Sequence, residues 1–218
     1  MPGPPLPARV GAPEPARGLG RLVSFEGIDG SGKSTVLARV AEALRHDGVD
    51  VVATREETAT PTGDWVKRSI QERWDPLATT FLFLADRVRH AKEIQAWRQA
   101  GRHVLCDRYL HSTYAYQSVT LADRMPEPLP FLQALHEAWC PMPERVLLFT
   151  CDPELAVRRI QGRPSTTPYE KAAFLGRVQE AYLAMAKRDG GRFTVLDSDR
   201  PLDAVVAEAT TVVRGLLR

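Results

Sequence analysis

The hydrophobic positions of this chain follow two spacings that alternate along it. Short apolar runs, of a kind that a sheet can bury on both faces, are separated by segments with apolar residues three or four positions apart, as at Leu37, Val40, Ala41 and Leu44. The runs predict five strands, Leu22–Glu26, Val49–Thr54, His103–Cys106, Arg145–Thr150 and Phe193–Leu196. Further helices are predicted at Leu77–Ala100, 131–138, 153–161, 170–188 and 201–216. Strands that alternate with helices of this length predict an α/β fold with a parallel sheet covered on both faces.

Residues 1–20 do not follow this pattern. They contain six prolines and four glycines. A segment with so few apolar residues cannot bury enough surface to offset the entropy lost on ordering. We therefore expect a disordered tail followed by one domain over residues 21–218, a length that suits a single α/β domain with its own core.

Charge and cysteine content narrow the class of protein. The formal net charge is +2 and no apolar run has the length of a membrane span, so neither nucleic acid nor a membrane is predicted as a partner. The cysteines Cys106, Cys140 and Cys151 form no C-x-x-C pair, and the N-terminus lacks the apolar segment of a signal peptide. We expect reduced thiols in a cytoplasmic protein.

A glycine-rich loop follows the first predicted strand. Residues Gly27–Ser34 fit the pattern G-x-x-x-x-G-K-[ST], and a predicted helix follows, which is the setting in which such a loop binds nucleotide phosphates. Lys33 can contact the β- and γ-phosphates, and the Ser34 hydroxyl can bind Mg²⁺. The loop residues predicted to bind ATP are Gly27, Gly30, Ser31, Gly32, Lys33, Ser34 and Thr35. The loop predicts a three-layer α/β/α P-loop NTPase fold, and the lack of a guanine-reading N-K-x-D segment argues against a switch GTPase.

Charged residues end two further predicted strands. Asp107 and Arg108 follow His103–Cys106, at the edge where a parallel sheet binds ligands. Asp107 is therefore a candidate ligand of Mg²⁺, and Arg108 is a candidate contact for the phosphate of an acceptor. The alternative is that Asp107 and Arg108 form an ion pair on the surface. Arg55 ends the second strand and should face the same crevice.

The long predicted helix carries a candidate base-binding pair. Phe83 and Arg87 lie four residues apart and share a face, where a ring beside a fork of donors suits a nucleobase. The alternative is that Phe83 belongs to the core. A neighbouring stripe is predicted to be core: Phe81, Leu84, Val88 and Ala91.

These segments together resemble the thymidylate kinase family. Phe25–Thr35 is similar to its phosphate loop, and Thr54–Glu56 to the start of its T-R-E-P segment. Phe83–Arg87 resembles its F-x-A-x-R helix, and Asp107–Gln117 its D-R-[YH]-x-x-S-x-x-A-Y-Q segment, which other P-loop kinases lack. The region from Tyr169 to Tyr182 resembles the lid and following helix of archaeal-type members. The resemblance covers Leu22 to the C-terminus.

The resemblance implies transfer of the γ-phosphoryl group of ATP to dTMP, with Mg²⁺, in a homodimer packed through helices such as Leu77–Ala100. It places Asp29 near the sugar 3′-hydroxyl, Arg55 and Arg108 on the dTMP phosphate, and Arg159 with the loop after Leu196 at adenine. The remaining residues that it places around thymidine are Phe83 stacked on the base, Arg87 at a base carbonyl, Ser112, Thr113 and Gln117 as polar contacts, and Tyr116 against sugar C2′.

Two positions depart from the family pattern. Glu57 replaces the usual proline, where a carboxylate either repels a phosphate or pairs with Arg55. Gly30 gives the phosphate loop no basic side chain, and Pro168 stands where the lid often has arginine. Within the predicted lid, about 162–170, we expect Arg163 to supply the catalytic cation; a solvated arginine is the alternative. A kinase for another pyrimidine monophosphate, or a weakly catalytic nucleotide-binding paralogue, remains open.

Overall fold

The computed structural model describes residues 18–160 and 172–217, so the predicted lid and Arg163 lie outside the described residues. Gly20, the last residue of the predicted tail, is buried against the long helix. Its N–H donates to the carbonyl oxygen of Arg98 at 2.8 Å, and Nε of Arg98 donates to the carbonyl oxygen of Gly20 at 2.7 Å. The chain therefore joins the domain at Gly20.

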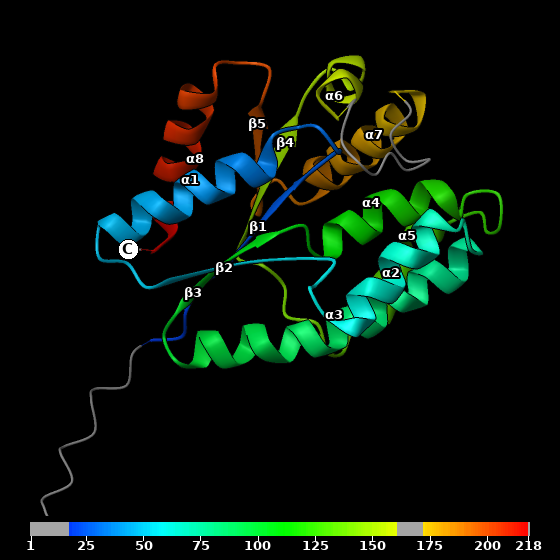
Figure 1. Cartoon of the computed structure of the whole chain (residues 1–218), viewed down its shortest axis with the longest axis horizontal. Coiled ribbons are helices and arrows are strands. Elements are labelled where there is room, and N and C mark those ends of the chain that lie inside the picture. Colours follow the sequence, from blue (N-terminus) through cyan, green and yellow to red (C-terminus); the bar gives the residue numbers. More distant parts are fainter. Residues whose placement is uncertain (1–17, 161–171, 218) are drawn as a thin grey trace, which may run out of the picture.

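Five parallel strands form one sheet in the order β2-β3-β1-β4-β5 (Figure 1). The strands are β1 (Leu22–Gly27), β2 (Val51–Arg55), β3 (His103–Asp107), β4 (Arg145–Thr150) and β5 (Phe193–Asp197). The predicted sheet is confirmed, with bounds that differ by no more than two residues at either end. Because β1 and β3 are neighbours and Phe25 pairs with Asp107, the glycine-rich loop and the Asp107–Arg108 pair emerge side by side.

Alternate residues of the strands face two separate cores. Val23 and Phe25 face one core together with the apolar residues of α1 and α8, whereas Leu22 faces the other, which includes residues of α3, α4, α5, α6 and α7. Burial of both faces explains why β1, β3 and β4 appear in the sequence as continuous apolar runs, whereas the edge strands β2 and β5 also have exposed positions. Ser24 and Glu26 are also fully buried, although they are polar.

Helices cover both faces of the sheet, with α1 and α8 packed together on one face (Figure 1). Their bounds are α1 (Lys33–His46), α2 (Pro61–Gln71), α3 (Pro76–Gln99), α4 (Leu110–Thr120), α5 (Pro128–Glu137), α6 (Pro153–Ile160), α7 (Ala172–Arg188) and α8 (Leu202–Leu217). In the described residues, no helix combines the length and the apolar character needed to cross a membrane.

The helices α2 and α4 were not among the predicted elements. The start of α2 has a sequence signal, because the Thr60 hydroxyl accepts a hydrogen bond from the Gly63 N–H and Pro61 occupies the first helical position. In α4 the buried positions include Ser112, Thr113 and Gln117. Polar residues on the buried face conceal the helical spacing of the apolar ones.

The predicted core stripe on α3 is wrong at two positions. Phe81 is 49% exposed and Val88 is 42% exposed, whereas Ala91 is buried. The buried face of α3 instead includes Arg87 and His90, which bond to other buried groups. Paired polar residues therefore take positions that hydrophobicity assigns to apolar ones.

Asp86, also on α3, holds the segment between β2 and α2. Its carboxylate accepts hydrogen bonds from the Thr58 N–H at 2.9 Å, from the Thr58 hydroxyl at 2.5 Å and from the Thr62 hydroxyl at 2.8 Å. Burial opposes ionisation, but the bonds from Thr58 and its neighbours outweigh burial and lower the pKa of Asp86 below its usual value.

The substitution Asp86→Asn should lower the free energy of unfolding at pH 7 by ~2 kcal/mol, because an amide cannot accept all the bonds made to a buried carboxylate. A depressed carboxyl pKa stabilises the fold above the unfolded-state pKa of about 4, and this stabilisation is lost as the pH falls through the folded-state value. In urea denaturation, the difference in unfolding free energy between the wild-type protein and Asp86→Asn should therefore shrink below pH ~4. The exposed Asp64→Asn variant is the control; an equal effect of both substitutions would contradict this role for Asp86.

Candidate active site

The glycine-rich loop connects the end of β1 to the start of α1. Gly30 has a φ of 83°, and a Cβ at this position would lie 2.3 Å from the carbonyl oxygen of Ala156. The backbone of Ala156 therefore leaves no room for a side chain at Gly30, so a basic residue could not be accommodated at this position of the loop. Lys33 begins α1 and is 5% exposed. Burial, followed by the charge of Arg108, lowers the pKa of Lys33, while Asp107 and Asp29 oppose this shift.

Ser34 and Asp107 meet beside this loop. The Ser34 hydroxyl donates to Oδ2 of Asp107 at 2.5 Å, and Oδ1 of Asp107 is buried without a hydrogen-bond partner among the described residues. A hydroxyl and a carboxylate with an unused oxygen are suitable ligands for Mg²⁺, which also keeps water and phosphate ligands. The described parts of the chain contain no cluster of three or more acidic, His or Cys side chains for a metal.

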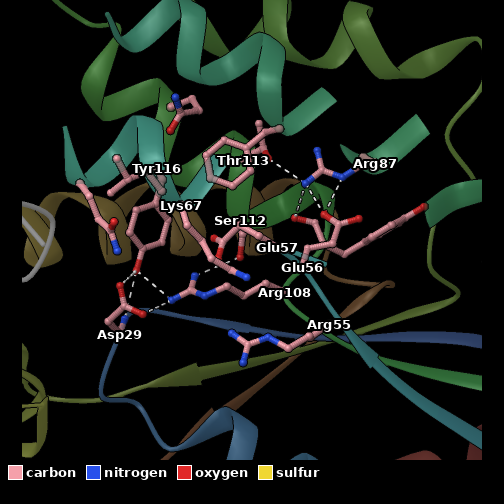
Figure 2. Close-up of a pocket in the computed structure, with 15 residues that line it drawn as sticks. Asp29, Arg55, Glu56, Glu57, Lys67, Arg87, Arg108, Ser112, Thr113 and Tyr116 are labelled. Carbon is pink, nitrogen blue, oxygen red and sulfur yellow. Dashed lines mark hydrogen bonds and ion pairs between the residues drawn. The ribbon is translucent and has the colours of Figure 1, made fainter. Parts of the chain in front are cut away.

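A cavity of about 330 Å³ lies next to this pair. All nine residues predicted to bind the acceptor line it: Asp29, Arg55, Phe83, Arg87, Arg108, Ser112, Thr113, Tyr116 and Gln117. They come from the ends of β1, β2 and β3 and from α3 and α4, and Figure 2 shows the labelled ones gathered around one space. Their individual roles toward a substrate stay predictions.

Arg108 occupies the centre of the polar side of the cavity. Its φ of 65° is a left-handed conformation, which costs a non-glycine residue roughly 1–3 kcal/mol and is found mainly at functional sites. The Arg108 guanidinium donates to Asp29, to the Ser112 hydroxyl at 3.2 Å and to the Tyr116 hydroxyl at 3.2 Å (Figure 2). It also lies 4.9 Å from the centre of the Tyr116 ring. These contacts fix the direction of a charge that faces the cavity.

Asp29 is the ionic partner of Arg108. Burial opposes ionisation of Asp29, but the charges of Arg108 and Lys33 outweigh it and lower the Asp29 pKa. The Asp29 N–H donates to the Tyr116 hydroxyl at 3.0 Å, and this hydroxyl donates in turn to Oδ2 of Asp29 at 3.2 Å. The phosphate loop is thus linked to α4 by a closed set of hydrogen bonds.

Arg87 is more deeply buried than the sequence indicates. It is 1% exposed and donates through Nε and Nη2 to Oε2 of Glu56, and through Nη2 to the Thr113 hydroxyl at 2.9 Å (Figure 2). Its Nη1 contacts Nε2 of His136 at 2.7 Å. Burial and then the Arg87 charge lower the pKa of His136 to about 4, so this ring is neutral and accepts. Among the described residues, Nη1 contacts only His136, so one N–H remains for a ligand.

Glu56 is the centre of this second network. Its other oxygen contacts Nδ1 of His90 at 2.9 Å, and Nε2 of His90 contacts the Thr54 hydroxyl at 2.8 Å. Burial opposes ionisation of Glu56, but Arg87 outweighs it and lowers the Glu56 pKa. Sequence reasoning gave Glu56 no role, although its place directly after Arg55 at a strand end was a usable signal.

The cavity also has a wall that the sequence did not predict. Lys67, Ile70 and Gln71 line it from α2, and Glu57 lines it beside Glu56. Lys67 places a further cation there, 3.1 Å from a carboxylate oxygen of Asp64. Within residues 18–160 and 172–217, no ion pair joins Glu57 to Arg55, so this predicted alternative is not observed.

Arg159, the predicted adenine contact, lies at the opposite side of the phosphate loop. It extends from α6 and donates to the carbonyl oxygens of Gly30 at 3.5 Å and of Ser198 at 3.4 Å, and it pairs with Asp199. Arg159 therefore connects the loop after β5 with the phosphate loop. Its contact with adenine stays a prediction.

Comparison with known proteins agrees with this geometry. The family model described as thymidylate kinase matches residues 25–209. A probable thymidylate kinase of Methanosarcina mazei is 44% identical over 188 residues, which cover 85% of this chain and 91% of the relative. A probable thymidylate kinase of Methanococcoides burtonii is 38% identical over 199 residues, which cover 91% of this chain and 98% of the relative. With its phosphate loop, its D-R-Y segment and this similarity over nearly the whole domain, the chain belongs to the thymidylate kinase family.

Proposed function

We propose that this protein transfers the γ-phosphoryl group of ATP to dTMP, which gives dTDP. The observation that carries this proposal is the continuity of two anion sites. Asp107 bonds to Ser34 beside the phosphate loop, and the next residue, Arg108, faces the acceptor cavity. A donor and an acceptor phosphate bound at these two places would meet, which is the arrangement that in-line phosphoryl transfer requires.

The described residues have distinct roles in this proposal. Lys33 and the N–H groups at the start of α1 bind the β- and γ-phosphates, and Arg108 with Arg55 binds the acceptor phosphate. Ionised Asp29 keeps Arg108 in place and is available to the sugar 3′-hydroxyl. Mg²⁺, held by Ser34 and Asp107, would neutralise charge on the transferred group. Arg163 remains the proposed cation between the two phosphates, outside the described residues.

The base site supports a pyrimidine with a carbonyl toward Arg87. Phe83 lines one wall, and the remaining N–H of Arg87 suits an acceptor such as a thymine carbonyl. The Glu57 carboxylate in the same cavity favours keeping a second candidate, a kinase for another pyrimidine monophosphate. A nucleotide-binding paralogue with little catalysis is the remaining alternative.

Assembly and location follow the family. We propose a homodimer that packs through α3, because Phe81 and Val88 form an exposed apolar stripe there. Measurement of the molar mass in solution tests this. A cytoplasmic location, with no nucleic-acid or membrane partner, is proposed from the modest net charge and the free cysteines.

Coupled measurement of ADP release with dTMP, dUMP, UMP, CMP, dCMP and dGMP tests the choice of acceptor. dTMP should be the best substrate and dUMP weaker, while purine monophosphates should react poorly because the proposed base site between Phe83 and Arg87 holds a single ring. Tyr116 should disfavour ribose by crowding the 2′-hydroxyl and not through lost hydrogen bonds. Such a pocket rejects an added hydroxyl by about a hundredfold at most, so kcat/KM for UMP should be up to about a hundredfold below that for dUMP. Preference for a cytosine nucleotide would contradict dTMP as the acceptor, and equal use of UMP and dUMP would contradict the role of Tyr116.

The variant Lys33→Ala should reduce kcat/KM by about a hundredfold or more, because the lost charge stabilises the phosphoryl group in the transition state by about 2.7 kcal/mol. Steady-state kinetics with ATP and dTMP measures this. Lys187→Ala removes an exposed lysine from the last turn of α7 and is the matched control. Turnover by the Lys33 variant that matches this control would show that the loop does not bind ATP for catalysis.

A further inference from the structure

Glu26 is a buried carboxylic acid behind the acceptor cavity. It lies in β1 immediately before Gly27 and has no exposed surface. The strand turns it away from α1, toward the core that contains α4 and α7. Neither the predicted phosphate contacts nor the cavity lining includes it, so its burial calls for an explanation in terms of its partners.

Three donors surround this carboxylate. The Tyr109 N–H donates to Oε1 at 3.0 Å, while the hydroxyls of Ser112 and Tyr182 donate to Oε2 at 2.6 Å and 3.3 Å. The oxygens of Ser112 and Tyr182 are themselves 2.7 Å apart. Glu26 thus connects β1 with the start of α4 and with α7.

Two of these partners also act on Arg108, in addition to the contacts that it makes with Asp29 and Tyr116. Tyr109 is the next residue in the chain, so its bond to Glu26 holds the backbone on the C-terminal side of the left-handed Arg108. Ser112 accepts a hydrogen bond from Nη1 of Arg108 at 3.2 Å. A hydroxyl has one hydrogen and two lone pairs. With its hydrogen directed to ionised Glu26, Ser112 has lone pairs for Arg108 and for Tyr182, whose single hydrogen is shared between Ser112 at 2.7 Å and Glu26 at 3.3 Å.

We propose that Glu26 is a positioning residue for Arg108: as a carboxylate, it directs the Ser112 hydroxyl so that Ser112 accepts from the guanidinium that binds the acceptor phosphate. This inference rests on the proposed function of Arg108. A protonated Glu26 would itself donate into the cluster. The Ser112 hydrogen would then turn from Glu26 toward the Tyr182 oxygen, and its lone pairs would be redirected so that Ser112 accepts from Glu26. The Arg108 contact, the longest of those that involve Ser112, would be weakened by this rotation.

The protonation of Glu26 is sensitive to pH near neutrality. Burial raises the Glu26 pKa to about 7, while the bond from Ser112 and the charges of Arg108 and Arg87 oppose the shift. Several ionisable groups act on this site. They are Arg108 at the end of β3, Tyr182 on α7, Arg87 on α3, Glu56 after β2, Cys106 in β3 and Lys33 on α1. The ionised form, which positions Arg108, is therefore lost as the pH falls through about 7.

The nearly isosteric variant Glu26→Gln tests the proposal, because its amide donates at every pH. At pH 8, the KM for dTMP should rise roughly tenfold, the effect of weakening one charge-assisted hydrogen bond, while kcat and the KM for ATP should change little. At pH 6, the wild-type and variant KM values should converge to within about twofold, because about nine-tenths of Glu26 is then protonated in the wild-type protein. Ionisation of dTMP itself affects both proteins and cancels in the ratio.

Glu144→Gln is the matched control. Glu144 accepts from the Leu22 N–H at 2.7 Å and from Arg98, at the opposite end of the same strand. This substitution should lower Tm without changing the KM for dTMP. If Glu26→Gln does not fold, Ser112→Ala provides the second variant, because it removes the hydroxyl that connects Glu26 with Arg108. The KM of this variant for dTMP should keep only the pH dependence that comes from dTMP itself.

The outcomes separate this inference from the proposed function. A wild-type protein that does not phosphorylate dTMP would overturn both. An active wild-type protein overturns the inference alone if Glu26→Gln raises the KM for dTMP equally at pH 6 and pH 8, raises the KM for ATP to the same degree, or changes only Tm.

Discussion

A buried charge must have a partner, and this requirement shapes the acceptor side of the molecule. Arg108 and Arg87 both line the cavity with largely buried side chains. Arg108 forms an ion pair with Asp29, and Arg87 forms one with Glu56. Removal of one partner from such a pair costs about 3–5 kcal/mol, because the remaining charge stays buried. The pairs therefore fix side chains that would otherwise move, and binding a phosphate or a base loses less conformational entropy as a result.

The parallel sheet brings these pairs together. Because β1, β2 and β3 run in the same direction, their carboxyl ends lie at one edge. β1 leads to Asp29, β2 to Glu56, and β3 to Arg108. The helices α3 and α4 then add Arg87 and Tyr116 above that edge. Charges distant in the sequence thus become partners through the strand order and the helices that pack above it, and the donor loop adjoins them because β1 occupies the middle of the sheet.

The sequence predicts the parts of this arrangement that depend on local pattern. The buried strands, the phosphate loop and nine residues of the cavity lining were accessible from spacing, motif and family resemblance, whereas the α2 wall of the cavity was not. The errors occur where tertiary pairing overrides hydrophobicity. Phe81 and Val88 are exposed because Arg87 and His90 occupy the buried face of α3. The helix α4 is missed because its buried face carries polar side chains.

Partners across the fold are the part that sequence reasoning did not supply. The sequence shows Glu26 and Glu56 only as acidic residues beside useful motifs. Their function depends on distances to Ser112, Tyr182, Arg87 and His90, which come from helices 30 or more residues away in the chain. Similarly, Arg87 was predicted as a donor to the base, and the structure adds that most of its hydrogens already serve the protein.

The central claim is that Arg108, held by Asp29, binds the phosphate of the acceptor nucleotide. Isothermal titration calorimetry of dTMP and of thymidine against the wild-type protein tests it most directly, because the two ligands differ only in that phosphate. Charge-assisted bonds from Arg108 and Arg55 predict that dTMP binds about a hundredfold more tightly, a difference of roughly 2–3 kcal/mol. Equal affinity for the two ligands would contradict the account.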